Sequence, residues 1–320
     1  MTGVIRLRAP SIRARAPSLR AFFSAFMWIL TGIFLGIPLN SVLIDMAGPS
    51  FRNFEQQMKQ QMSNFTSEGR IFCMISTMPE NHEKRAYPVK DTWARRCDQH
   101  LFVSYKDDKD LPAVGLKVKE GRKFLYEKAR QAFSLVYYNY YNDFDWFYKA
   151  DDDTYVVVEN LRRLLKDYDP TKPHYLGFKY RKKPDPQKKR PGAIYMSGGS
   201  GYVISKEALR LLVEDGIKGG VCKQADTTSE DVFIGICFEK LGVEAGDSRD
   251  KYGRDRFLPL HMVWHVVPNY TRGIPSWFKN YSYYPSIQGA ECCSDYVIAL
   301  HYFKSEYMYI MDYLLYRVKK

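Results

Sequence analysis

A run of apolar and aromatic residues in the middle of the chain ends abruptly in three consecutive acids. The run covers residues 146–150, with Lys149 as its one charged residue, and the acids are Asp151, Asp152 and Asp153. After them, a leucine-rich stripe at i, i+3, i+4 and i+7 predicts an amphipathic helix; it consists of Leu161, Leu164, Leu165 and Tyr168. The acids therefore lie at the end of a buried strand, where open α/β sheets bind their ligands.

The same alternation of strand and helix patterns extends along the chain on both sides of the acids. Predicted strands cover residues 70–77, 101–104, 114–118 and 203–204, and a predicted helix covers 124–141. The polar segment that ends at 93–97 has helical character. Strands that alternate with helices predict an α/β fold with a mostly parallel sheet flanked by helices, in a single domain after the amino-terminal segments.

Two serines mark the starts of predicted helices in the second half of the chain. Ser205 caps a helix that Gly216 stops, and Ser229 caps another. Glu230 and Asp231 occupy the first turn of the second helix, where the helix dipole stabilises an ionised carboxylate. Such acids either complement the helix end or act as a positioned general base, and the spacing alone favours neither.

The three acids have two interpretations. Adjacent carboxylates repel one another, and a fold tolerates them most easily beside a cation, which favours a divalent-metal site over a solvated acidic loop. His301 follows a short apolar run, which predicts that it is buried in the core. It becomes a metal candidate if the fold brings it beside Asp153.

The amino end predicts a membrane anchor. Residues 1–20 carry five arginines and no acid, and residues 21–39 contain no charge, which is about enough to span a bilayer as a helix. Because the basic flank precedes the span, the amino end should stay cytoplasmic. We expect a cytoplasmic tail (1–20), a signal-anchor (21–39), a stem (40–69) and a luminal domain (70–320). A cleaved signal peptide is the alternative.

The stem and the cysteines bear on oligomerisation and compartment. Residues 45–69 are polar and Gln-rich, and predict a loose tether. A broken heptad pattern leaves open a coiled-coil stem that would make a homodimer. Six cysteines, an even number, suit an oxidised luminal domain. N-glycosylation sequons begin at Asn64, Asn269 and Asn280.

Charge and aromatic content suggest classes of partner. The formal charge of +12 favours anionic partners, but the sequence contains no zinc-finger spacing or RNA-binding motif, so we expect no nucleic-acid partner. The basic, proline-punctuated stretch 179–190 predicts a loop, which is either a solvated insertion or a contact for an acidic partner or glycoprotein surface. The aromatic loops around Trp277 and Tyr283 suit either a sugar-stacking platform or a packed lid.

Several motifs resemble those of inverting β1,3-glycosyltransferases. They are the acid-containing stretch 145–155, the Tyr-Met-Ser-Gly-Gly turn 195–199 and the Ser-Glu-Asp-Val segment 229–232. More narrowly, segments 243–250, 280–285 and 292–295 resemble the core 1 galactosyltransferase branch of that family. The resemblance covers the chain from Arg70 to its carboxy end.

This resemblance implies a GT-A fold that uses UDP-galactose and Mn²⁺ to galactosylate the 3-hydroxyl of N-acetylgalactosamine (GalNAc) on Ser or Thr of glycoproteins. It also implies a single-pass type II Golgi membrane protein with a luminal catalytic domain. The implied metal ligands are Asp151, Asp153 and His301. The implied nucleotide-sugar contacts are Ser76, Thr77, Arg122, Lys128, Asp151 and Asp152.

The resemblance assigns the remaining roles as well. Asp231 is the implied base, and Trp277 with Tyr283 is the implied acceptor platform. The implied disulfides are Cys73–Cys97, Cys222–Cys237 and Cys292–Cys293. Lys279 departs from the family, which usually has an aromatic residue there, and this puts acceptor preference in doubt. The alternatives are transfer of another UDP-sugar or to another acceptor, and a non-catalytic luminal chaperone.

Overall fold

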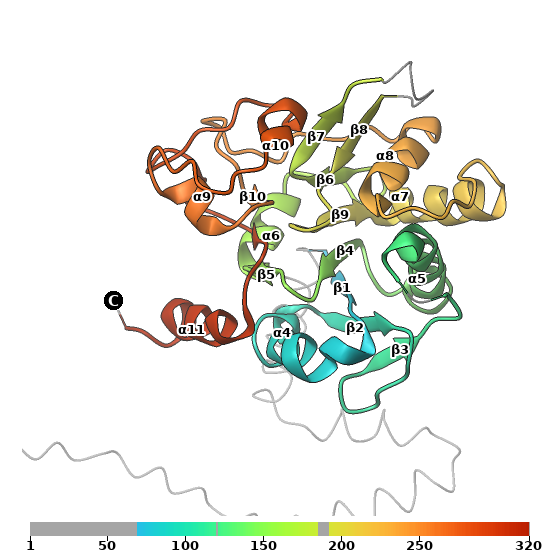
Figure 1. The fold of residues 1–320 in the computed structure, drawn as a ribbon. Coiled ribbons are helices and arrows are strands. Elements are labelled where there is room, and N and C mark those ends of the chain that lie inside the picture. Colours follow the sequence, from blue (N-terminus) through green and yellow to red (C-terminus); the bar gives the residue numbers. More distant parts are fainter. Residues whose placement is uncertain (1–68, 120, 185–191, 320) are drawn as a thin grey trace, which may run out of the picture. The chain divides into compact units, whose positions relative to one another are not determined.

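The computed structural model describes residues 69–119, 121–184 and 192–319, which belong to one compact unit, Thr66–Lys320 (Figure 1). The predicted cytoplasmic tail, anchor and stem, and the Asn64 sequon, lie outside the described residues. Within the described part, no helix is long and apolar enough to cross a membrane.

The central sheet has six strands in the order β3-β2-β1-β4-β9-β6. They are β1 (Ile71–Ser76), β2 (Gln99–Ser104), β3 (Ala113–Gly115), β4 (Trp146–Asp151), β6 (Tyr175–Gly177) and β9 (Tyr202–Ser205). The pairs among β3, β2, β1 and β4 are parallel, whereas β9 runs antiparallel to both its neighbours. The fold is thus α/β, as predicted, but the sheet is mixed because one strand is reversed.

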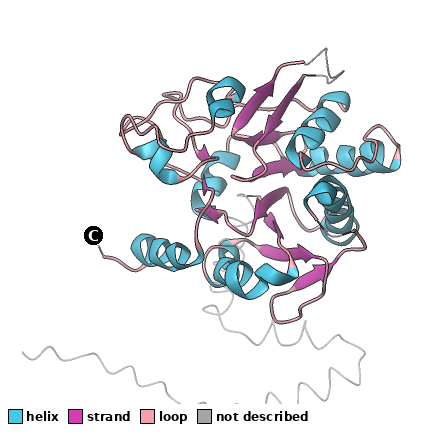
Figure 2. Cartoon of the chain, in the orientation of Figure 1, coloured by secondary structure: helices cyan, strands magenta, loops and turns pink. Residues whose placement is uncertain are grey.

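Two smaller sheets complete the strands (Figure 2). One contains β10 (Phe257–Leu258), β11 (Ala299–Leu300) and β5 (Tyr155–Val156), and the other is the hairpin of β7 (Lys179–Lys182) and β8 (Ala193–Met196). The hairpin corrects one prediction. The first part of the basic stretch, expected to be a loop, is a strand.

The helices cover both faces of the central sheet. The α-helices are α4 (Tyr87–Asp91), α5 (Leu125–Tyr140), α6 (Val158–Leu165), α7 (Lys206–Arg210), α8 (Glu230–Lys240), α9 (Met262–Val266), α10 (Ser276–Tyr281) and α11 (Ser305–Tyr316). Short 3₁₀ or π segments are η1 (Pro79–Asn81), η2 (His82–Ala86), η3 (Ala94–Arg96), η4 (Arg122–Phe124) and η5 (Leu211–Lys218).

Strand β1 shows why the sheet is buried on both sides. Ile71, Cys73 and Ile75 pack in one core with α4 and α6, whereas Phe72 and Met74 pack in a second core with α5, α7 and α8. Side chains alternate between the faces of a strand, so an unbroken apolar run is what a strand with two covered faces requires.

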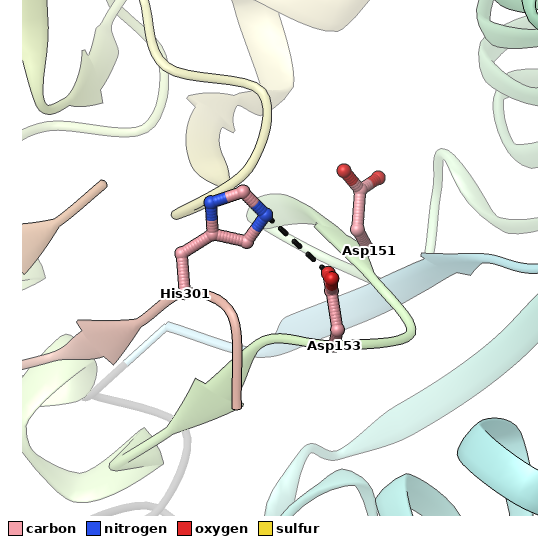
Figure 3. A group of neighbouring side chains, drawn as sticks. All are labelled: Asp151, Asp153 and His301. Carbon is pink, nitrogen blue, oxygen red and sulfur yellow. Dashed lines mark ion pairs between the residues drawn. The ribbon is translucent and has the colours of Figure 1, made fainter. Parts of the chain in front are cut away.

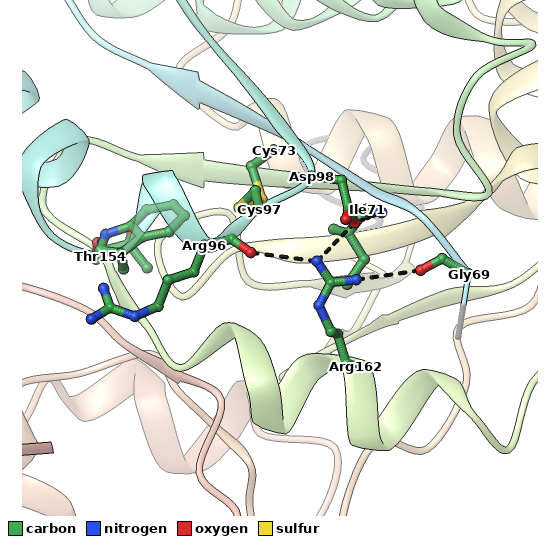
Figure 4. Close-up of a disulfide and its surroundings, with 9 residues drawn as sticks. Gly69, Ile71, Cys73, Arg96, Cys97, Asp98, Thr154 and Arg162 are labelled. Atoms are coloured by element: carbon green, nitrogen blue, oxygen red, sulfur yellow. Dashed lines mark hydrogen bonds and ion pairs between the residues drawn. A yellow bond between two sulfur atoms is a disulfide. The ribbon is translucent and has the colours of Figure 1, made fainter. Parts of the chain in front are cut away.

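Three disulfides tie loops to this framework: Cys73–Cys97, Cys222–Cys237 and Cys292–Cys293. They are the pairs that the resemblance implies. Figure 4 shows the first pair beside Arg162 of α6, which donates to the Arg96 carbonyl and lies 2.7 Å from Asp98 Oδ2. This network attaches the segment after η3 to the helix that follows the acids.

The structure corrects two predicted helix ends. Ser205 accepts a hydrogen bond from Ala208 N and caps α7 as predicted, but the helical segment continues through Gly216 as η5. Gly216 faces Cys222 Sγ so closely that a Cβ would collide with it, so close packing rather than termination requires glycine there. Ser229 occupies the N-cap of α8, but its side chain makes no capping bond.

Candidate functional site

The acids lie at the end of β4, in the middle of the central sheet. Asp151 ends that strand and pairs in register with Ser76, the last residue of β1. The ends of two parallel strands therefore meet at one edge, and the turn of Asp152 and Asp153 follows there. This is the position that the sequence predicts for the acids.

His301 reaches the acids through the pairing of two short strands. β5 follows the acids and β11 precedes His301, and their antiparallel register pairs Tyr155 with Leu300. His301 Nε2 lies 3.4 Å from Asp153 Oδ1 (Figure 3). Phe303 N donates to the Asp153 carbonyl. The histidine that follows an apolar run is thus beside Asp153, the condition that the sequence set for a metal candidate.

The donor atoms of Asp151, Asp153 and His301 suit a divalent metal ion. One ligand atom from each residue can be chosen so that all lie within 4.8 Å of one another. His301 Nδ1 is 3.0 Å from the Pro259 carbonyl, which can only accept, so this nitrogen carries a proton and directs Nε2 toward Asp153. A backbone carbonyl that orients a histidine in this way is a common outer-shell contact of metal ligands.

Electrostatics reinforces the pair of Asp153 and His301. Burial lowers the pKa of the His301 imidazole, but the hydrogen bond and charge of Asp153 outweigh this effect and raise its pKa. Burial likewise raises the pKa of Asp153, yet His301 and Arg85 bring it below its usual value. Without a bound cation, each residue therefore stabilises the charged form of the other.

Asp152 is buried and is held by polar side chains that follow β1. Its Oδ2 accepts hydrogen bonds from Thr77 Oγ1 at 2.7 Å and from Asn81 Nδ2 at 2.9 Å. Burial, partly offset by these bonds, raises the pKa of Asp152 to about 6. Arg85 Nη1 lies 3.5 Å from both Asp152 and Asp153. Sequence reasoning missed Asn81 and Arg85, because a polar segment after a strand gives no signal of what it contacts.

The expected nucleotide contacts are only partly assembled. Lys128 of α5 is buried and donates to the Thr77 carbonyl; its desolvation lowers its pKa to about 8. Ser76 ends β1 beside Asp151. Arg122, on η4, is exposed, and the structure gives it no direct contact with the acids.

A buried lysine connects the acids to the start of α8. Lys149 Nζ donates to Asp151 Oδ1 at 2.8 Å and lies 3.4 Å from Glu230 Oε2. Burial alone would lower the pKa of Lys149, but Asp151 and Glu230 outweigh it and raise the pKa. Tyr202 OH donates to the other Glu230 oxygen at 2.7 Å. Glu230 therefore has a structural role that the sequence did not reveal.

Asp231, the neighbour of Glu230, is held by backbone groups and faces the glycine turn. Its Oδ1 accepts from Val232 N at 2.9 Å, and its Oδ2 accepts from Gly198 N at 3.2 Å. Burial raises the pKa of Asp231 despite these two bonds, and the charge of Asp151 raises it further. A carboxylate with a raised pKa is a stronger base than a solvated one.

The glycine turn allows His301 and Asp231 to lie close to its backbone. A Cβ on Gly199 would overlap the His301 ring, and Gly201 has a φ of +74° with Tyr148 OH where a Cβ would point. Thr154 Oγ1 donates to the Gly199 carbonyl at 2.7 Å, which connects the turn to the acids. Gly198, Gly199 and Gly201 therefore allow close packing around the site.

The aromatic residues expected at an acceptor platform lie on α10 and just after it, against strand β7 of the neighbouring hairpin. Trp277 is 40% exposed, and its ring centroid is 5.9 Å from that of buried Tyr180 on β7. Tyr180 packs on Tyr195. Burial and the charge of Asp231 raise the pKa of Tyr195. Tyr283 lies against Lys179 of β7, whose Nζ is 4.8 Å from the centre of its ring. The two aromatic residues thus flank the same strand.

Comparisons with known proteins give the family. A family profile described as Fringe-like matches residues 66–250. Glycoprotein-N-acetylgalactosamine 3-β-galactosyltransferase 1 of Xenopus laevis is 42% identical over 250 residues, covering 78% of this chain and 67% of its own length. β-1,3-Glucosyltransferase of Mus musculus is 27% identical over 62% of this chain, which spans 41% of that relative.

Among solved structures, Drosophila β-1,4-galactosyltransferase 7 in complex with manganese, UDP-Gal and xylobiose aligns with 57% of this chain. Its TM-score is 0.32 and its sequence identity is 13%. The family profile covers more than half of the chain, and the Xenopus relative is aligned over two thirds of its own length. The chain therefore belongs to the Fringe-like family and is a homologue of glycoprotein-N-acetylgalactosamine 3-β-galactosyltransferase 1.

Proposed function

We propose that this protein transfers galactose from UDP-galactose, with inversion, to the 3-hydroxyl of GalNAc α-linked to Ser or Thr of glycoproteins. The product would be the core 1 O-glycan. One observation carries the proposal. Asp151, Asp153 and His301 converge beside Asp231 at one edge of the sheet, in a chain that is 42% identical to a galactosyltransferase of that name.

In this proposal the site has a GT-A fold and binds Mn²⁺. Two carboxylates and one imidazole make a mixed oxygen and nitrogen donor set that suits this ion together with a diphosphate. Asp151, Asp153 and His301 would hold it. When bound, the ion supplies positive charge that stabilises the departing UDP.

The chain's own residues hold the donor. Asp152 is oriented by Thr77 and Asn81 through Oδ2, and its Oδ1, 3.5 Å from Arg85, would accept from a ribose or sugar hydroxyl. Lys128 and Arg122 supply positive charge for the diphosphate, and Ser76 and Thr77 line the same strand end. Lys128 keeps its buried position through the Thr77 carbonyl.

Asp231 is the proposed general base. Inversion by a single displacement needs one base that removes the proton from the attacking hydroxyl, and no carboxylate nucleophile. Gly198 N and Val232 N each donate to one carboxylate oxygen of Asp231, which fixes its orientation while leaving lone pairs for the acceptor. Trp277 with Tyr283 would form the platform for the GalNAc ring.

The rest of the chain completes the proposal. Residues 1–20 would be the cytoplasmic tail, 21–39 the signal-anchor, 40–69 the stem and 70–320 the luminal catalytic domain. The protein would then be a single-pass type II protein of the Golgi membrane. Sequons at Asn269 and Asn280 are both exposed, as glycosylation requires.

Kinetics of three purified full-length proteins test the chemistry. Wild type should galactosylate a GalNAc-Thr peptide in the presence of Mn²⁺ and lose activity on chelation. Asp231→Asn should lower kcat by about two or more orders of magnitude while UDP-galactose still binds. Asp153→Ala should abolish the response to Mn²⁺. Undiminished turnover by Asp231→Asn would remove the base assignment.

A panel of donors separates this proposal from its alternatives. UDP-galactose should be used in preference to UDP-glucose and UDP-N-acetylglucosamine, which are the donors of other β1,3-transferases. Turnover with either of those sugars instead would assign a different transfer on the same site. A chain that binds UDP and Mn²⁺ but transfers no sugar would support a non-catalytic chaperone.

A further inference from the structure

Strand β7 places two cations against one of the proposed platform residues. Lys179 and Arg181 alternate with the buried Tyr180, so both project from the outer face of the hairpin. Lys179 Nζ lies 4.8 Å and Arg181 Cζ 5.1 Å from the centre of the Tyr283 ring. Such distances are typical of cation–π contacts.

Backbone contacts hold these groups together. Tyr283 N donates to the Lys179 carbonyl at 3.1 Å, and Ser282 forms an antiparallel bridge with Tyr180. The segment after α10 therefore extends the hairpin edge, and Trp277 lies across Tyr180 on that helix. The cations and both aromatic residues consequently keep a fixed arrangement along one strand.

Most of the charge along this edge is not offset by described carboxylates; the exception is Lys179, on which the charges of Asp247 and Glu244 act. Within residues 69–119, 121–184 and 192–319, no carboxylate forms an ion pair with Lys179, Arg181, Lys182 or Lys279; the nearby Arg249, by contrast, pairs with Asp247 at 2.9 Å. Lys279 is exposed on α10, two residues after Trp277. Each of the two aromatic residues proposed to contact the acceptor therefore has a cation without an ion pair close by: Arg181 at Tyr283, and Lys279 two residues after Trp277.

We propose that this cationic edge, defined as Lys179, Arg181, Lys182 and Lys279, selects acceptor polypeptides with Asp or Glu beside the glycosylated Ser or Thr. The inference rests on the proposed function and names its preferred substrate class. An acidic peptide is favoured over an anionic membrane because the cations lie next to Tyr283 and Trp277, where the peptide that flanks a bound acceptor sugar would lie. Carboxylates at flanking positions would meet unpaired cations, whereas Lys or Arg there would be repelled.

Exposed ion pairs are weak individually, and this bounds the expected effect. Two or three such pairs predict about a three- to tenfold higher kcat/KM for an acidic glycopeptide than for its basic counterpart at low salt. Since exposed charges are screened beyond about 3 Å at 1 M salt, the preference should nearly vanish there.

The test uses full-length protein and two glycopeptides that differ only in Asp or Lys on either side of GalNAc-Thr. The double variant Arg181→Glu, Lys279→Glu should reduce the acidic-to-basic ratio to one or below. The double variant Lys106→Glu, Lys109→Glu, which reverses two charges at exposed sites in the β2–β3 loop, should keep the wild-type ratio. A wild-type ratio near one, or a ratio unchanged in the double variant, would overturn the inference.

Two further measurements separate this inference from the proposed function. Phenyl α-GalNAc carries no peptide, so failure to galactosylate it counts against the proposed function alone. Binding of fluorescent versions of the two glycopeptides then decides the inference without turnover. If the double variant instead loses binding to phosphatidylserine vesicles while its peptide preference is unchanged, the edge serves a membrane and the inference is wrong.

Discussion

Lys149 illustrates how single residues connect parts of the site. It is the one charged residue of β4 before Asp151, and it contacts Glu230, which lies 81 positions later in the chain. Lys149 is 5% exposed and Glu230 7% exposed, so neither charge is compensated by water. A single lysine in an apolar strand indicates a buried acidic partner, but the sequence alone does not identify which Asp or Glu pairs with Lys149.

Removal of this cation should destabilise the protein. Lys149→Met leaves Glu230 and Asp151 without their shared partner, and loss of one member of a buried pair costs about 3–5 kcal/mol. Urea unfolding should show this loss in the free energy of unfolding. The double variant Lys149→Met, Glu230→Gln should recover part of it, since no buried charge then remains at Glu230. A single variant as stable as wild type would contradict the arrangement.

Gly199 provides a second test at this scale. Gly199→Ala places a methyl group in the space of the His301 ring, so the imidazole must move away from Asp153. We expect the Mn²⁺ concentration for half-maximal activity to rise at least tenfold, with an unchanged circular dichroism spectrum. Ser200→Ala is the matched control, because that hydroxyl has no hydrogen-bond partner within the described structure. Equal Mn²⁺ responses of the two variants would argue against His301 as a ligand.

At the scale of elements, the pattern of apolar residues predicted several strands and one long helix correctly. The strands at β1, β2 and β4 and the helix α5 match their predictions to within a few residues, because apolar periodicity reports burial. Sequence reasoning did not predict helix α11. Eight large apolar or aromatic side chains in this helix or just after it are exposed, so the helix has no one-sided apolar stripe that would identify it. Reversal of β9 also escaped prediction, because strand direction depends on a connection rather than on composition.

The Cys73–Cys97 disulfide should stabilise the first part of the sheet. It spans 24 residues between β1 and the segment after η3, and a loop of that size predicts about 3 kcal/mol from chain entropy. Replacement of both cysteines by alanine should therefore lower the free energy of unfolding by roughly that amount. Cys292 and Cys293 are adjacent, so the same replacement there should cost much less chain entropy. Equal losses from both replacements would contradict this reasoning.

Helix α9 gives the stability of the protein a dependence on pH. His265 is 2% exposed, its Nε2 accepts from Leu260 N, and burial lowers its pKa to about 4. Because the unfolded chain takes up a proton that the folded state refuses, the contribution of neutral His265 is complete above about pH 6.5 and falls as pH drops toward 4. His265→Gln should lose less stability than wild type across that window in urea titrations at several pH values. Parallel curves would show that His265 does not titrate there.

At the scale of the whole molecule, the candidate site is assembled from distant segments. Asp151 and His301 are 150 positions apart, and the β5–β11 register brings them together; Asp231 joins them through the glycine turn. The sequence pattern identified each of these residues as a candidate, but only the family resemblance predicted that they belong to one site. The resemblance, rather than the acids, also names the sugar, because carboxylates that hold a metal do not distinguish galactose from glucose.

The most direct test of the central claim is the structure of the reaction product. Purified full-length protein would be incubated with UDP-galactose, Mn²⁺ and a peptide that carries one GalNAc-α-Thr, and the product examined by nuclear magnetic resonance. We predict a single added galactose, β-linked to the 3-hydroxyl of GalNAc. An α-linked galactose, a linkage to another hydroxyl, or no transfer of galactose at all would contradict the account.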